Sequence, residues 1–303
     1  MSKKSRLDVG FSLDWLSFTV KDIPDTTVAR ALLFGQDMNS YIEVPPMNGY
    51  SYAVRHPFGH FVMSNTKRRD MGVHVMFSGS ALNELLTGGI DQFKLIRWAV
   101  GEGAKITRID LAVDLYGTPV DMDKLYRSKQ IKGAEGSARK RERRENDEGG
   151  YTIYFGSRKS DKVLRVYNKA AERHLPGVVW TRFEMEFKSD PAHEVATAIM
   201  SMTFDEAMVY TMGLIKGQYN ADDALYQELL QSPARQVPTT KDPSDTTLDW
   251  LMGPVAKTLA KQMRLHSHKN VWKMFQEAVA ANLKAQGGMP PGNGKNGMDA
   301  ETK

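Results

Sequence analysis

The sequence contains no cysteine, which excludes disulfide scaffolds, zinc sites built from thiolates, and cysteine nucleophiles. No apolar run approaches the roughly 20 residues that a membrane-spanning helix requires. The basic N-terminal segment is not followed by the apolar stretch of a signal peptide. Basic residues are only in small excess, because 41 Lys and Arg against 36 Asp and Glu give a formal net charge of +5. We therefore expect a cytoplasmic protein with no membrane partner, for which a nucleic-acid partner is permitted but not required.

Alternation of apolar and polar residues is the main pattern that the sequence does contain, and it is typical of strands with one buried face. It is clearest in residues 105–116, where Ile109, Leu111 and Val113 alternate with polar or small residues. The strands that we predict cover 11–20, 72–78, 105–116, 151–156, 162–169 and 180–188, with further short strands inside 41–70. The helices that we predict between them cover 26–39, parts of 81–102 and 121–130.

After Pro191 the apolar spacing changes to that of helices. The helices that we predict there cover 205–214, 222–230 and 249–284. The sequence thus predicts an α+β protein whose first part is an antiparallel sheet with flanking helices. We expect that β-rich part to span residues 1–190, a helical region to span 191–285, and a disordered tail to span 286–303.

Three of the predicted strands, and one histidine on a fourth, carry a selective set of polar side chains on one face. These side chains are Arg108, Asp110 and Asp114, then Arg165, Tyr167 and Lys169, then Arg182, Glu184, Glu186 and Lys188, and finally His74. If the strands share a sheet, the polar faces can form one patch. Clustered carboxylates resist ionising unless a cation neutralises them, so a Mg²⁺ or Mn²⁺ site beside a phosphate-binding surface is one interpretation. Cross-strand ion pairs on a solvated sheet are the other.

Several segments, in this order along the chain, resemble the Rep_trans family of rolling-circle replication initiators, which are found on plasmids and filamentous phages. They are DWLSFT, GVHVMFSGSAL, ITRIDLAVDLY, TIYFGSRKSDKVLRVYNKAAE and WTRFEMEFK. The resemblance covers roughly residues 11–190 and implies a nickase fold. It makes residues 1–190 a catalytic nicking-closing domain and the helical region 191–285 a candidate for origin DNA binding or oligomerisation. It also implies that a tyrosine attacks a phosphodiester in an origin, becomes linked to the 5′-phosphate and releases a 3′-OH primer, with help from Mg²⁺ or Mn²⁺. The implied partner is origin DNA, both duplex and single-stranded or hairpin, with a host helicase and polymerase as further candidates.

The family's tyrosine motif matches residues 165–169 here, so the resemblance makes Tyr167 the nucleophile and Tyr154 the second candidate. An ordinary strand aromatic is the alternative for Tyr154. The metal ligands that the resemblance implies are Asp110 and Glu184 first, then Asp114, Glu186 and His74. For His74 a structural role is the alternative, and Asp114 or Glu186 could instead serve as a base or an ion-pair partner. The expected phosphate contacts are Arg108, Arg158, Arg165, Lys169 and Arg182, with ion pairing to the carboxylates as the alternative.

Two segments outside the matched motifs are also charged. Residues 139–148 hold mixed charges and indicate a solvated loop or helix, with a grip on an origin hairpin as the alternative. Residues 249–284 indicate a basic amphipathic helix that could bind duplex DNA, dock on the core or form a homodimer. Two other functions stay open at this point. One is a conjugative or mobilisation relaxase with the same chemistry, and the other is a non-catalytic DNA-binding regulator.

Overall fold

The computed structural model describes residues 7–22, 24–25, 28, 41–57, 59–87, 89–130, 140–145, 150–231, 263 and 270–277. The chain divides into two compact units, residues 1–239 and residues 240–303. In the second unit, residues 270–277 are helical, within the helix predicted over 249–284. The predicted helix at 26–39 and the predicted tail at 286–303 lie outside the described residues, apart from Val28.

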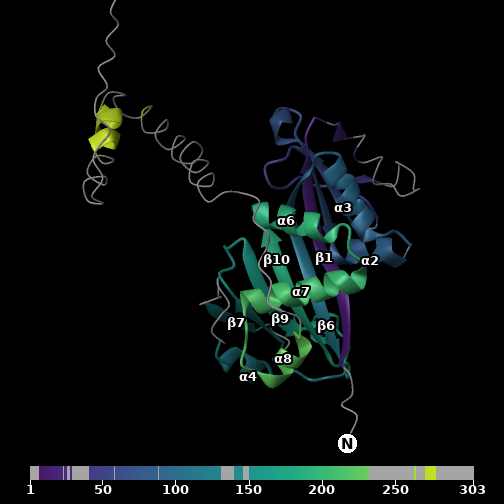
Figure 1. Cartoon of the computed structure of the whole chain (residues 1–303). Helices are drawn as coiled ribbons and strands as arrows, with labels where there is room; N and C mark the ends of the chain where they lie inside the picture. The colour runs from purple at the N-terminus through teal and green to yellow at the C-terminus, as the bar shows by residue number, and fades with distance from the viewer. Residues whose placement is uncertain are drawn as a thin grey trace, which may run out of the picture. The chain divides into compact units, whose positions relative to one another are not determined.

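An antiparallel sheet of ten strands is the framework of the first unit (Figure 1). Its spatial order is β2-β3-β4-β5-β1-β6-β10-β9-β8-β7, so the long strands β1, β6 and β10 lie at its centre. The strands are β1 (Asp8–Val20), β2 (Ile42–Glu43), β3 (Tyr52–Arg55), β4 (Phe61–Ser64), β5 (Val73–Ser78), β6 (Lys105–Tyr116), β7 (Arg141–Glu145), β8 (Tyr151–Phe155), β9 (Lys162–Asn168) and β10 (Trp180–Lys188). All strands predicted from alternation are present, which confirms the α+β fold class.

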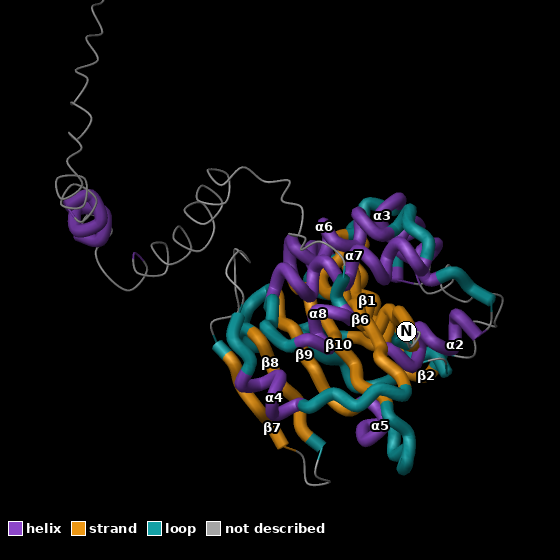
Figure 2. The backbone as a smooth tube through the Cα atoms, turned by 60° about the horizontal axis from the view of Figure 1, so that its bottom comes forward, coloured by secondary structure: helices purple, strands orange, loops and turns teal. Residues whose placement is uncertain are grey.

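Helices cover one face of this sheet, as Figures 1 and 2 show for α6 and α7. The helices of the first unit are α2 (Gly79–Thr87), α3 (Gln92–Gly101), α4 (Met122–Arg127), α5 (Lys169–Glu172), α6 (Ser189–Ile199), α7 (Phe204–Gln218) and α8 (Ala224–Leu229), with a 3₁₀ turn, η2, at Arg69–Met71. A capping box fixes the start of α7, because Thr203 and Glu206 each bond the other's backbone N–H. Within the described residues, no helix is long and apolar enough to cross a membrane.

Alternation decides which face of the central strands is buried under the helices. The inward side chains of β6 and β10 are fully or almost fully buried; they include Ile109, Leu111, Val113, Phe183, Met185 and Phe187. Helix α6 contacts β6 and β10, and α7 contacts β1, β6, β9 and β10. Phe155 of β8 stacks on Tyr219, which follows α7, with ring centroids 4.0 Å apart.

The first compact unit ends at Thr239, whereas we expected a boundary at residue 190. The apolar sides of α6 and α7, with Val195, Ile199, Leu214 and Ile215, belong to the same hydrophobic core as the sheet. A sheet with one apolar face must bury that face against another layer, and here the segment after residue 190 supplies the layer. The first compact unit accordingly extends to Thr239.

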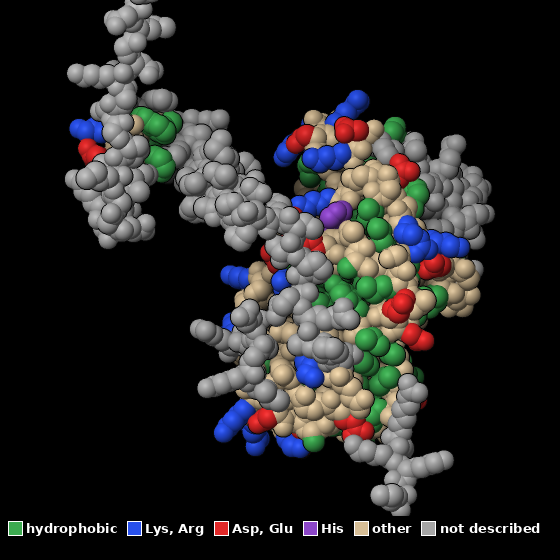
Figure 3. Space-filling model, viewed as in Figure 1, with side chains coloured by type: hydrophobic (Ala, Val, Ile, Leu, Met, Phe, Trp, Pro, Cys, Tyr) green, Lys and Arg blue, Asp and Glu red, His purple; other side chains and the backbone are tan. Residues whose placement is uncertain are grey.

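The charged run at 139–148 contains a strand where we expected a loop or helix. β7 pairs antiparallel with β8 and is the outermost strand of the sheet. An edge strand needs a hydrogen-bonded neighbour on one side only, and charged side chains along it discourage pairing with another chain. The side chains of β7 are half-buried or exposed, and Figure 3 shows Lys and Arg side chains along the rim near β7 and α4.

If α6, α7 and α8 complete the core, a fragment of residues 1–239 should fold and a fragment of residues 1–190 should not. We expect the longer fragment to unfold in one cooperative transition in urea, because its apolar sheet face is covered. The shorter fragment should show no such transition and should be digested rapidly by protease. A cooperative transition of the 1–190 fragment would contradict this account.

Candidate active site

The polar faces of β6, β9 and β10 meet on the side of the sheet opposite α6 and α7. The strand register places Arg182 of β10 opposite Asp114 on one side and Tyr167 on the other. Two residues further along β10, Glu184 lies opposite Arg165 of β9. Glu186 in turn lies opposite Asp110 of β6. The convergence expected from alternation is therefore present for these three strands.

The Tyr167 hydroxyl has a carboxylate as its hydrogen-bond acceptor. It donates to Glu184 Oε2 over 2.7 Å, and the Glu184 side chain is fully buried. Burial of the phenol, with the negative charge of Asp14, raises the pKa of Tyr167 above the ordinary value of a tyrosine. The phenol is therefore protonated at neutral pH, and Glu184 is positioned to receive its proton.

A buried ammonium group also lies near the same hydroxyl. Lys169 Nζ is 3.4 Å from the Tyr167 oxygen and 2.6 Å from Glu172 Oε2. Burial and the nearby positive charge of Arg182 lower the pKa of Lys169 below its ordinary value. This ammonium could stabilise a phenolate, or the phosphate that replaces it.

Two arginines neutralise the carboxylates toward β6. Arg108 binds Asp110 through Nε (2.9 Å) and Nη2 (2.6 Å), and Nη2 also lies 3.0 Å from Glu186 Oε2. Arg165 forms an ion pair with Glu184 and lies 3.4 Å from Asp110 Oδ2. Burial raises the pKa of Asp110 although Arg108 opposes the shift. Each of these two guanidinium groups thus forms ion pairs with two carboxylates.

Arg182 is held by a second set of acceptors. Its Nε and Nη2 each donate to Asp114 over 2.8 Å, and Nη1 forms an ion pair with Asp14. Trp180 Nε1 donates to Asp114 Oδ1 over 2.7 Å. Burial opposes ionisation of Arg182, but Asp114 and Asp14 raise its pKa above the ordinary value. Asp114 therefore positions Arg182 beside Tyr167.

The expected metal ligands do not form a cation site in this arrangement. No group of three Asp, Glu or His among the described residues could hold a metal ion. The carboxylates of Asp110, Glu184 and Asp114 are instead paired with guanidinium groups. His74 is not brought to the carboxylates; it lies on β5, two strands from β6. There it bonds Thr19 Oγ1 over 2.8 Å and stacks on Tyr50. Burial lowers the pKa of His74 to about 4. As arranged, these side chains do not fit a divalent cation.

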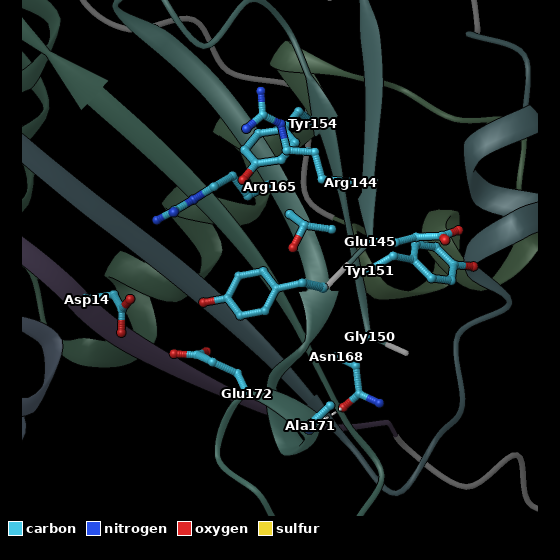
Figure 4. A pocket seen from close by; sticks show the side chains of 12 residues that line it. Asp14, Arg144, Glu145, Gly150, Tyr151, Tyr154, Arg165, Asn168, Ala171 and Glu172 are labelled. Carbon is cyan, nitrogen blue, oxygen red and sulfur yellow. Dashed lines mark hydrogen bonds between the residues drawn. The ribbon is translucent and has the colours of Figure 1, made fainter. Parts of the chain in front are cut away.

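A cavity of about 320 Å³ opens beside Tyr167. β9 contributes Arg165 and Tyr167 to its wall, and β8 and β7 contribute Tyr154 and Arg144. Figure 4 shows Asp14 and Glu172 on one side of the cavity and Tyr154 and Arg144 on the other. The predicted phosphate contact Arg158 lies next to this wall, with its guanidinium carbon 5.2 Å from the centre of the Tyr154 ring.

Asp14 is a site residue that the sequence analysis did not single out. It occupies an irregularity in β1, where the register with β6 shifts between Leu13 and Trp15. The signal for this bulge is present in the sequence, because the buried residues Leu13, Leu16 and Phe18 are spaced by three and then by two. Gly79 makes room for it, since a Cβ there would lie 2.5 Å from Asp14 Oδ1.

Comparison with known proteins identifies a family and a shared fold. Residues 104–275 match the family model described as replication initiation factor (Rep_trans), which is more than half of the 303 residues. A rolling-circle replication initiator protein from Geobacillus stearothermophilus superposes with a TM-score of 0.57 at 23% identity. The match covers 76% of this chain and 94% of that chain. It shows that the two proteins share a fold. No curated protein matches by sequence. The chain belongs to the Rep_trans family of replication initiation factors.

Proposed function

We propose that this protein starts rolling-circle replication by nicking one strand of origin DNA with Tyr167. The observation that carries the proposal is the 2.7 Å hydrogen bond from the Tyr167 hydroxyl to the buried carboxylate of Glu184, in a patch of ammonium and guanidinium groups. Membership of the replication initiation factor family supports the role in initiation. The fold shared with a named rolling-circle initiator supports that mode of replication.

In the proposed step the Tyr167 oxygen attacks the scissile phosphorus. A bond forms between that oxygen and phosphorus while the bond from phosphorus to the 3′-oxygen breaks. The phenol proton passes to Glu184 Oε2, and the departing 3′-oxygen takes a proton from solvent water to become the 3′-OH primer. The 5′-phosphate stays on Tyr167 as a phosphotyrosine, which conserves the energy of the phosphodiester for rejoining.

Cations around Tyr167 are placed to bind the phosphate. Lys169 lies beside the reacting oxygen, and Arg165 borders the cavity. A phosphate accepts charge-assisted hydrogen bonds from the same donors that carboxylates use. It can therefore replace a carboxylate as the partner of some of the N–H groups of the half-buried Arg165. Arg182 is fixed by Asp114 and Asp14, which makes it a preorganised positive charge. Arg108 and Arg158 are the further candidates.

Tyr154 has a different environment from Tyr167. Its ring lies 5.2 Å from the guanidinium carbon of Arg158 and 6.0 Å from that of Arg144. Tyr167 instead donates directly to a carboxylate. A proton acceptor within hydrogen-bond reach is the first requirement of an activated nucleophile. This contrast supports Tyr167 over Tyr154.

Metal assistance by Mg²⁺ or Mn²⁺ stays a prediction from the family resemblance, and no part of the step above is assigned to a metal. The host helicase, the polymerase and a homodimer likewise stay predictions. A mobilisation relaxase would use the same chemistry on a transfer origin. A non-catalytic regulator would bind origin DNA without forming any covalent adduct, so the adduct separates it from both enzymes.

Replacing Tyr167 by phenylalanine should abolish the covalent protein–DNA adduct. Supercoiled origin plasmid is incubated with full-length protein, and nicked circles that carry protein are counted on denaturing gels. The Tyr167→Phe variant lacks the attacking oxygen, so we expect no adduct but retained DNA binding. Tyr154→Phe is the matched control and should still form the adduct. An adduct formed by Tyr167→Phe and lost in Tyr154→Phe would reverse the assignment.

Nicking should decline at high pH as Lys169 loses its proton. Burial lowers the pKa of this lysine, so its ammonium is lost at a lower pH than that of an ordinary lysine. Lys169→Arg keeps the positive charge at every accessible pH and should move the decline upward. Lys169→Met should slow nicking by about 10²–10³-fold at neutral pH, the usual effect of removing a charge-stabilising donor. Identical pH profiles of wild type and Lys169→Arg would exclude this role.

A divalent cation and Arg165 should compete for the same carboxylates. Arg165 pairs with Glu184 and Asp110, so a cation can bind there only after the guanidinium moves. We expect Arg165→Gln to bind Mn²⁺ more tightly than wild type, as measured by titration with electron paramagnetic resonance detection. The control Arg97→Gln removes an exposed ion pair on α3 and should leave Mn²⁺ affinity unchanged. Equal affinities of wild type and Arg165→Gln would show that Mn²⁺ does not use these carboxylates.

A further inference from the structure

The cavity beside Tyr167 continues across β8 to the edge strand. Tyr167 lies opposite Thr152 of β8, and Thr152 lies opposite Arg144 of β7. Neighbouring strands are about 4.8 Å apart, so the backbone of Arg144 lies roughly 10 Å from that of Tyr167 across the small side chain of Thr152. All three residues line the cavity. Tyr167, Thr152 and Arg144 therefore form the floor of the cavity, which leads from the proposed nucleophile to the edge of the sheet.

Tyr154 lines the same cavity with its aromatic ring. It lies opposite Arg165 on β9 and is half-buried. The guanidinium carbons of Arg158 and Arg144 lie 5.2 Å and 6.0 Å from its ring centre. Figure 4 shows Tyr154 and Arg144 side by side at the cavity wall. Both guanidinium groups lie over the ring. A base that stacks on Tyr154 therefore takes the place of an arginine, and the displaced guanidinium group can bind an adjoining phosphate.

The two arginines are available for DNA at small cost. Arg158 is exposed. Arg144 pairs only with Glu142 of its own strand in the contacts described, at 2.5 Å, and its side chain is 53% exposed. Exposed ion pairs of this kind add little stability, so a phosphate can replace Glu142 without a large penalty. Among the described strands β7 is the outermost, so this end of the floor lies at the edge of the sheet.

We infer that Tyr154, Arg144 and Arg158 form a subsite for the nucleotide next to the scissile phosphate in single-stranded DNA. The base stacks on the Tyr154 ring, and the arginines bind the adjoining phosphates. This inference rests on the proposed function, because the subsite matters for nicking only if Tyr167 is the nucleophile. It also gives Tyr154 a positioning role in place of a covalent one. Stacking tolerates any base, so the subsite orients the strand without reading its sequence.

The test compares two 12-nucleotide probes by fluorescence anisotropy with full-length protein. One probe is oligo(dT), and the other has the same phosphates but abasic sugars. We expect Tyr154→Leu to bind oligo(dT) about tenfold more weakly than wild type, the loss typical of one stacked base. The same variant should bind the abasic probe as wild type does. Tyr154→Phe keeps the ring and Tyr52→Leu removes an exposed tyrosine on β3. Both controls should leave the affinity for oligo(dT) unchanged.

Replacing either arginine should change DNA binding in a different way from replacing Tyr154. Arg144→Gln and Arg158→Gln should weaken both probes alike and reduce the salt dependence of binding by about one phosphate contact each. Equal weakening of both probes by Tyr154→Leu would overturn the stacking role, and so would unchanged binding of both. The adduct assay separates this failure from failure of the proposed function. If the adduct forms on Tyr167 but Tyr154→Leu does not selectively weaken oligo(dT) binding, only the subsite is refuted. If Tyr154→Leu selectively weakens oligo(dT) binding but no adduct forms, only the nicking is refuted.

Discussion

The central strands of this protein carry apolar side chains on one face and charged side chains on the other, and the rest of the structure depends on that constraint. Apolar side chains at alternate positions of β6 and β10 pack beneath α6 and α7. The intervening positions must then lie on the opposite face, where β6, β9 and β10 bring Asp110, Tyr167 and Glu184 within reach of one another. The same alternation that stabilises the fold thus assembles the site.

Charge compensation makes this polar face stable although many of its charges are buried. Asp110, Asp114, Arg182 and Glu184 are almost fully inaccessible to water, and leaving one such charge without its partner costs about 3–5 kcal/mol. Guanidinium groups prevent this by spanning pairs of carboxylates, as Arg108 spans Asp110 and Glu186. The net charge of +5 conceals this arrangement, because the site is built from nearly balanced opposite charges. Its function depends on their local order.

The sequence allowed the strands, the fold class and the shared polar face to be predicted, because alternation is a local property that survives folding. It did not reveal β7, since a charged edge strand has no apolar face to mark it. The boundary expected at residue 190 followed a change of period, but helices with apolar sides pack on the nearest open sheet whatever their position in the chain. Asp14 was missed because a bulge displaces it from the alternating pattern. Alternation predicts which face of its strand His74 lies on. It does not predict how far that strand lies from β6 in the sheet.

Digestion of the covalent adduct with trypsin, followed by mass spectrometry, tests the central claim most directly. Cleavage after Arg165 and Lys169 releases the short peptide 166–169, whereas Tyr154 lies in the separate peptide 145–158. We predict that the nucleotide remnant is found on Tyr167 in the peptide 166–169, attached through a 5′-phosphate. A remnant on Tyr154, on a serine, or on a 3′-phosphate would contradict the account.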